Sequence, residues 1–117
     1  MESNDRAIRR EKLDRELRYF MIAGKKAEYF PHWLRRVRQA LGLHVTDIAR
    51  ALGVNKSVIY RLEKSEDKKS ISLNSLEKAA RAMECQLVYA IVPRAGQTML
   101  ELAETQKWRR KLRREKK

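Results

Sequence analysis

The chain has 117 residues, of which 28 are Lys or Arg and 15 are Asp or Glu, so its formal net charge is +13. This length fits one domain with extensions, and an apolar content of 43% is enough for a modest core. The longest apolar run, residues 87–92, is too short to cross a bilayer, and the N-terminus lacks the apolar stretch of a secretory signal. With Cys85 as the single cysteine, no internal disulfide can form. We therefore expect a cytoplasmic protein that binds a polyanion, with nucleic acid ahead of a membrane surface.

The positive charge is concentrated at the C-terminal end of the chain. Residues 107–117 hold eight basic residues and one acidic residue, which amounts to more than half of the net charge. Such a run is typical of a solvated tail that binds polyanions without sequence preference. Because phosphate contacts carry no base information, the tail can add affinity but not specificity. Trp108, inside this run, is expected to anchor a core or an interface, with base stacking as the alternative.

Helical periodicity predicts two helices before residue 42. The first is expected to run from an N-cap at Asp5 to about residue 26. Its buried face would be Leu13, Leu17, Phe20 and Met21. Pro31 suits the first position of the second helix, because its missing N–H would have no helical partner there. Gly42 would end that helix, whose apolar stripe is Leu34, Val37 and Leu41.

Residues 43–64 carry the most informative pattern in the chain. A short helix is predicted from four apolar residues on one face, which are Val45, Ile48, Ala49 and Leu52. Gly53 would end this helix in the left-handed conformation, and Asn55 would cap a second helix. That second helix buries Val58, Ile59 and Leu62. Two short helices joined through a glycine, with the small Ala49 where they cross, predict a helix-turn-helix.

The remaining elements are a loop, a helix, a strand and a last helix. A polar loop is expected over residues 65–70, followed by a helix that is capped by Ser72 and buries Leu73, Leu76, Ala80 and Met83. Residues 87–92 predict a short strand, with Cys85 as a small buried residue at its entrance. Thr98 and Glu101 form a capping box for a final helix that runs to about residue 112.

A lone strand leaves its backbone hydrogen-bonding groups unpaired, so it needs a second strand. We expect two copies of the chain to pair this strand across a two-fold axis, as a homodimer. The residues assigned to this dimer contact are Leu87, Val88, Tyr89, Ile91 and Val92. This arrangement would place two recognition helices about 34 Å apart, one turn of DNA.

The sequence "LRRVRQALGLHVTDIARALGVNKSVIYRLEKSE", with the following "SLNSLEKAARAME", resembles the Xre family of Cro and lambda-repressor type DNA-binding domains over residues 34–84. More narrowly, residues 6–110 resemble the family named mobile mystery protein A, through the N-terminal helix, Trp33, "RLEKSE" and "CQLVYAIVP". The first resemblance implies a five-helix DNA-binding fold that acts as a dimer. The second implies a small bacterial regulator whose gene commonly neighbours a Fic-domain protein, and hence an antitoxin-like role.

The resemblance to the Xre family also implies roles for individual residues. Base-reading positions are matched by Lys56, Ser57 and Arg61, and positions near the phosphates by Asn55 and Lys64. Arg38 and Glu63 match an Arg–Glu pair that ties the first core helix to the end of the recognition helix. Two positions depart from the family pattern: Val45 replaces a frequent Gln that bonds to phosphate, and His44 replaces the usual Ser or Thr cap.

Groove geometry adds further candidates from the residues themselves. Arg61 could donate two hydrogen bonds to a guanine edge, or it could be a solvated helix arginine. For Tyr60, contact with a thymine methyl or a phosphate is weighed against simple surface cover. Arg35, Arg36 and His44 complete the candidates for contact with the DNA backbone. His32 and His44 have no second ligand at metal-binding spacing, and no catalytic motif occurs, so neither a metal, a cofactor nor an enzyme activity is expected.

The sequence therefore predicts an all-α fold. Its parts are an N-terminal helical extension (1–30), a helix-turn-helix domain (31–86), a strand and helix for dimerisation (87–112) and a basic tail (113–117). The function expected is a transcriptional regulator, a repressor, that binds a palindromic operator in double-stranded DNA as a homodimer. An alternative is an antitoxin-like protein that neutralises a Fic-type toxin through Leu13, Leu17 and Phe20 and represses its own operon. RNA binding is a third hypothesis, but the sequence shows no platform of residues on which RNA bases could stack.

Overall fold

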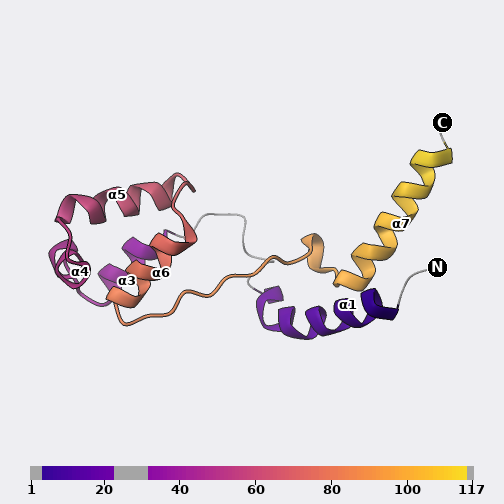
Figure 1. Cartoon of the computed structure of the whole chain (residues 1–117), viewed down its shortest axis with the longest axis horizontal. Helices are drawn as coiled ribbons and strands as arrows, with labels where there is room; N and C mark the ends of the chain where they lie inside the picture. The colour runs from indigo at the N-terminus through magenta and orange to yellow at the C-terminus, as the bar shows by residue number, and fades with distance from the viewer. Residues whose placement is uncertain (1–3, 23–31, 116–117) are drawn as a thin grey trace. The chain divides into compact units, whose positions relative to one another are not determined.

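The computed structural model describes residues 4–22 and 32–115, and every element of regular structure in these ranges is helical (Figure 1). The chain divides into two compact units, one formed by residues 30–89 and the other by residues 1–29 together with 90–117. Within the described ranges, no helix combines the length and the apolar character needed to span a membrane.

In the unit of residues 30–89, the described residues form four helices. These are α3 (Trp33–Ala40), α4 (Val45–Leu52), α5 (Lys56–Asp67) and α6 (Leu73–Ala82). Gly42 and Gly53 both have φ of 69°, the left-handed conformation that lets the chain leave a helix, so both predicted helix ends are confirmed. Ser72 also acts as predicted, because its Oγ accepts the Ser75 N–H at 3.1 Å.

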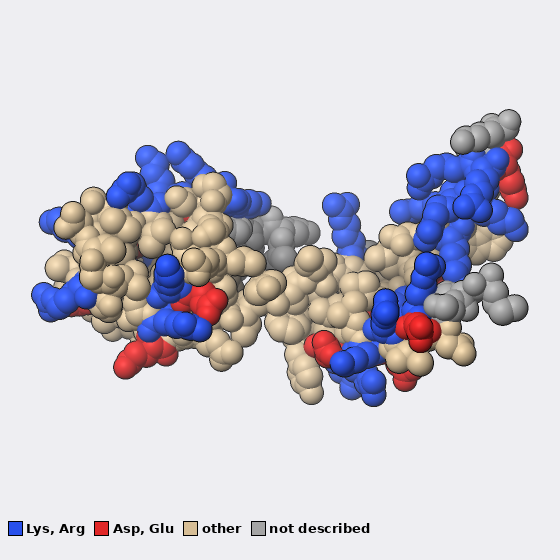
Figure 2. All heavy atoms as spheres, viewed as in Figure 1, with Lys and Arg blue, Asp and Glu red and all other residues tan. Residues whose placement is uncertain are grey.

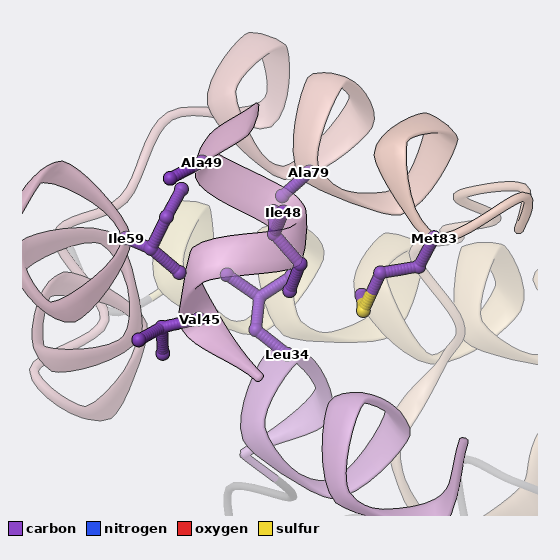
Figure 3. Close-up of a cluster of buried hydrophobic side chains, with 7 residues drawn as sticks. All are labelled: Leu34, Val45, Ile48, Ala49, Ile59, Ala79 and Met83. Atoms are coloured by element: carbon purple, nitrogen blue, oxygen red, sulfur yellow. The ribbon is translucent and has the colours of Figure 1, made fainter. Parts of the chain in front are cut away.

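The core of this unit lies where the four helices meet (Figure 3). Its members are 3–7% exposed and are Leu34, Val45, Ile48, Ala49, Ile59, Ala79 and Met83. In Figure 3, Ala49 of α4 lies beside Ile59 of α5, and the side chain of Ile48 lies next to that of Leu34 of α3. The small side chain of Ala49 thus permits the close approach of α4 and α5, as the sequence predicted. The packing sets the direction of α5.

Several expectations for this unit were wrong. Leu41 and Leu73 are 53% and 49% exposed, because each lies at or just beyond a helix end rather than on the packed face. Ala79 fills the core in place of Leu73. The polar loop predicted from residue 65 begins later, since α5 continues to Asp67. Cys85 was expected to be buried and is exposed, because it follows the end of α6.

The other unit contains α1 (Asn4–Leu17), the 3-10 turns η1 (Arg18–Phe20) and η2 (Arg94–Gly96), and α7 (Met99–Glu115). Asp14 of α1 accepts the backbone N–H groups of Met99 and Leu100, at 2.7 and 3.4 Å, so it caps the start of α7. The predicted capping box is confirmed: Glu101 N–H donates to Thr98 Oγ1 at 3.1 Å and Thr98 N–H to Glu101 Oε1 at 3.4 Å.

The N-terminal helix differs from its prediction in extent and in exposure. It begins at Asn4, so Asp5 lies in the first turn rather than at the N-cap. The predicted end near residue 26, and Pro31, lie outside the described residues. Leu17 is 6% exposed and Phe20 is half-buried. Leu13 was also expected to be buried and is 39% exposed, so only part of the face suggested for docking a toxin is covered within the chain itself.

The strand expected over residues 87–92 is not formed. Residues 85–93 are assigned neither helix nor strand. A strand requires a hydrogen-bonded neighbour, and within the described ranges no backbone hydrogen bond involves residues 86–92. The basic run at the C-terminal end also differs from expectation, since residues 107–115 belong to α7 rather than to a tail.

Candidate nucleic-acid interface

The turn between α4 and α5 sets where α5 begins. Gly53 adopts φ 69° and ψ 35°, and the Val54 N–H donates to the Ala49 carbonyl at 2.9 Å. Asn55 is extended at φ −74° and ψ 151°, the conformation of an N-cap residue, and its carbonyl accepts the Val58 N–H at 3.0 Å. The Asn55 side chain makes no capping hydrogen bond, which leaves its amide available to a ligand.

The polar face of α5 points out of the molecule. All four of its predicted base-contact residues are exposed: Lys56, Ser57, Tyr60 and Arg61. They occupy positions i, i+1, i+4 and i+5, which share one side of a helix. Ile59 on the opposite side is 3% exposed and belongs to the core. One face of α5 therefore anchors the helix and the other presents a hydroxyl, a phenol, an ammonium and a guanidinium to solvent.

The middle of α5 is tied to α3 by a two-pronged ion pair. Arg38 Nε and Nη2 donate to the two carboxylate oxygens of Glu63, at 3.0 and 3.1 Å. The Arg38 side chain is 16% exposed and the Glu63 side chain 5%. Arg38 Nη1 also donates to the Leu43 carbonyl at 3.4 Å, before α4 begins. One guanidinium thus links α3, the α3–α4 connection and the recognition-helix candidate.

Glu66 makes a second link between α5 and α3, which sequence reasoning missed. It is 1% exposed, and its two carboxylate oxygens accept the N–H groups of Trp33 and Leu34 at 3.0 and 2.8 Å. A carboxylate stabilises a helix N-terminus, because the first N–H groups have no helical partner and the helix dipole is positive there. One signal was present in the sequence: Glu66 lies three residues after Glu63 and so shares its side of α5.

Arg35, a predicted phosphate contact, is engaged with the end of α5. Its Nη2 donates to Asp67 Oδ2 at 2.8 Å, and its Nε lies 3.5 Å from Glu63 Oε1. His32 Nδ1 lies 2.7 Å from the other oxygen of Asp67. Hydrogen bonding to Arg35, and then to His32, lowers the pKa of Asp67, while the same contact with Asp67 raises the pKa of Arg35.

The other residues that were predicted to contact the DNA backbone differ in their surroundings. Lys64 is exposed one turn beyond Tyr60. Arg36 is exposed, with its guanidinium 5.3 Å from the centre of the Trp33 ring. His44 is exposed at the start of α4, and its N–H donates to Asp47 Oδ2 at 2.9 Å. In the part of the chain that the structure describes, no three His, Cys, Asp or Glu side chains lie close enough together to hold a metal ion.

Comparison with known families agrees with this geometry. Residues 34–89, a little under half of the chain, match the model of a helix-turn-helix family. The match takes in α4, α5, α6 and all of α3 except Trp33, and it supports the broad helix-turn-helix family. No curated protein and no solved structure matches the chain.

Proposed function

We propose that residues 34–89 bind double-stranded DNA in a sequence-specific manner, with α5 in the major groove, and that the protein is a transcriptional regulator. The match to a helix-turn-helix family suggests a DNA-binding regulator. The single observation that carries the proposal is the two-sided character of α5, whose Ile59 is in the core while Lys56, Ser57 and Arg61 are exposed together.

The geometry supports separate roles for the candidate residues. Lys56 and Ser57 stand at the N-terminal end of α5, from which side chains of a recognition helix reach base edges. Arg61, one turn further, has the planar donor pair that matches the O6 and N7 acceptors of guanine. Asn55 and Lys64 flank this set, and we assign phosphate contacts to them as part of the proposal. Tyr60, 57% exposed, lies between them.

Repression is the outcome that we propose for DNA binding. A protein that occupies an operator excludes other proteins from the same DNA, which requires no further surface. This role would place the protein with the chromosome in the cytoplasm. Membership of the narrower mobile mystery protein A family is part of the proposal and rests on the sequence alone.

The test is a selection of binding sites from random duplexes by the wild-type protein and by Arg61→Ala. The wild type should enrich one sequence motif, and Arg61→Ala should lose the preference at one position, a discrimination of about 1–3 kcal/mol. Lys78→Ala removes an exposed charge from α6 and is the matched control, which should keep the full motif. If the wild type enriches no motif, or if Arg61→Ala keeps it unchanged, base reading by α5 is wrong.

We further propose that the protein binds a palindromic operator as a homodimer through residues 87–92. Val88, Tyr89 and Ile91 are 65%, 68% and 83% exposed, which is unusual for adjacent apolar side chains, and Leu87 and Val92 are half-buried. The segment lacks backbone partners within the described ranges, so a second copy could supply them as a two-stranded ladder.

Light scattering after size-exclusion chromatography tests this dimer. Val88→Pro removes a backbone donor and should shift the protein toward monomer, whereas Val88→Thr keeps the donor and the β-branched shape and should remain dimeric. A dimer that is equally stable in both variants would contradict strand pairing, and a monomeric wild type would contradict the homodimer.

A further inference from the structure

The C-terminal half of α7 carries the densest charge in the molecule. Six of the eight residues from 107 to 114 are Lys or Arg, and all six are exposed. Figure 2 shows Lys and Arg side chains gathered along this helix. Lys107 is paired with Glu104, whose carboxylate oxygen lies 3.4 Å from its Nζ. Residues 107–114 themselves contain no acidic residue, so the positive charge is dense along this part of α7.

This charge is carried by an ordered helix. Asp14 and the capping box of Thr98 and Glu101 satisfy the N–H groups at the start of α7, and the helix then continues to Glu115. Arginines in its last turn also interact favourably with the helix dipole. At 1.5 Å per residue, residues 107–114 extend about 12 Å, which corresponds to roughly three to four base pairs of duplex DNA.

From these observations we propose that residues 107–114 form a second DNA-binding element, which binds the phosphate backbones of duplex DNA without reading sequence. The proposal deepens the function assigned to α5, on which it rests for the choice of duplex DNA as ligand. At 100° per residue the six basic side chains cover roughly 200° of the helix circumference. The major groove of DNA is about 12 Å wide, so a helix that lies in it has a phosphate backbone on each side. Basic side chains that cover so much of the helix circumference can therefore contact the phosphates of both strands.

The remaining face of the helix argues against an anionic membrane as the ligand. That face holds Trp108 and Leu112, which are 63% and 53% exposed. Glu104 lies one turn before Trp108, and Glu115 lies about one turn after Leu112. A helix that lies in a membrane interface needs a continuous apolar face, and here a carboxylate stands at each end of a two-residue patch. Lys111, 5.5 Å from the centre of the Trp108 ring, adds a charge at its edge.

The test is the salt dependence of binding to a random-sequence duplex, measured with the full chain by fluorescence anisotropy. The variant replaces Arg109, Arg110, Arg113 and Arg114 with Gln, which preserves helix propensity and is checked by circular dichroism. The control replaces Arg9, Lys12 and Arg15 of α1 and Arg18 of η1 with Gln, which removes the same charge from the same unit.

The α7 variant should weaken random-duplex binding by at least about tenfold and flatten the slope of log K against log salt by about 3 to 4, one phosphate per arginine. The α1 control should change the slope by less than about 1. Equal slopes in the two variants would overturn the proposal. So would tighter binding of wild type to phosphatidylserine-containing vesicles than to duplex, if Trp108→Ala abolished it.

Failure of this inference is distinguishable from failure of the function proposed for α5. The α7 variant should still enrich the wild-type motif in the selection from random duplexes, because base contacts would remain. Loss of that motif while α7 remains helical would show that α7 reads sequence. This result would contradict the proposal that α7 contacts only the phosphate backbones of the DNA. A wild type without any motif would instead refute the role of α5.

Discussion

The buried carboxylate of Glu66 gives the sharpest stability prediction. Glu66→Gln keeps the side-chain volume and one acceptor, but it turns an NH2 group toward one of the two backbone N–H donors at the start of α3. One charge-assisted hydrogen bond, worth about 1.5–3 kcal/mol, is lost. The favourable interaction of the carboxylate with the helix dipole, up to about 2 kcal/mol in a partly buried site, is lost with it. We expect the free energy of unfolding of residues 30–89 to fall by about 2–4 kcal/mol.

Urea denaturation followed by Trp33 fluorescence measures this loss. Trp33 belongs to the same unit as Glu66, whereas Trp108 lies in the other unit, so Trp108→Phe serves as the background for every protein compared. Glu77→Gln is the matched control: Glu77 Oε1 lies 2.6 Å from Arg81 Nη2, but its side chain is 47% exposed. Such a surface pair contributes about 0.5 kcal/mol or less. If Glu66→Gln costs no more than Glu77→Gln, Glu66 does not hold α3 to α5 as described.

Three further predictions concern the same unit and the same denaturation assay. Arg38→Lys cannot reproduce the two-pronged contact with Glu63 and should cost about 2–3 kcal/mol; a loss below about 0.5 kcal/mol would show that the pair is dispensable. Gly53→Ala meets no atom within 4 Å of the added Cβ, so only its φ of 69° is penalised, by about 1–2 kcal/mol, and Gly53→Asn should cost less. A larger loss for Asn than for Ala would contradict that reasoning. Because the pKa of Asp67 is lowered on folding, its contribution is complete above about pH 4 and is lost as pH falls through the folded pKa. The stability difference between wild type and Asp67→Asn should therefore shrink toward acid, and a difference that grows there would refute the assignment.

The helix-turn-helix was predictable from the sequence because its determinants are local. Gly53, Asn55 and the apolar spacing of α4 each act within a few residues, and all three have the predicted conformation in the structure. The exposure of the α5 polar face follows from the same periodicity.

The features that sequence reasoning missed depend on contacts between distant residues. Glu66 lies 32 residues from Leu34, whose N–H it accepts, so no local pattern connects them. The extension of α5 to Asp67 has the same origin, because Glu66 and Asp67 both contact the start of α3. Residues 87–92 have strand propensity, but propensity supplies no partner strand.

The central claim, that the exposed face of α5 lies against duplex DNA, is tested most directly by cleavage from a tethered iron–EDTA group. The probe is attached at Ser57→Cys on α5 and, separately, at Lys78→Cys on α6, both in a Cys85→Ser background that removes the native thiol. On a duplex that carries the selected motif, the probe on α5 should cut within the motif, and the probe on α6 should cut weakly or outside it. Equal cutting from both positions, or stronger cutting within the motif from α6, would contradict the placement of α5 in the groove.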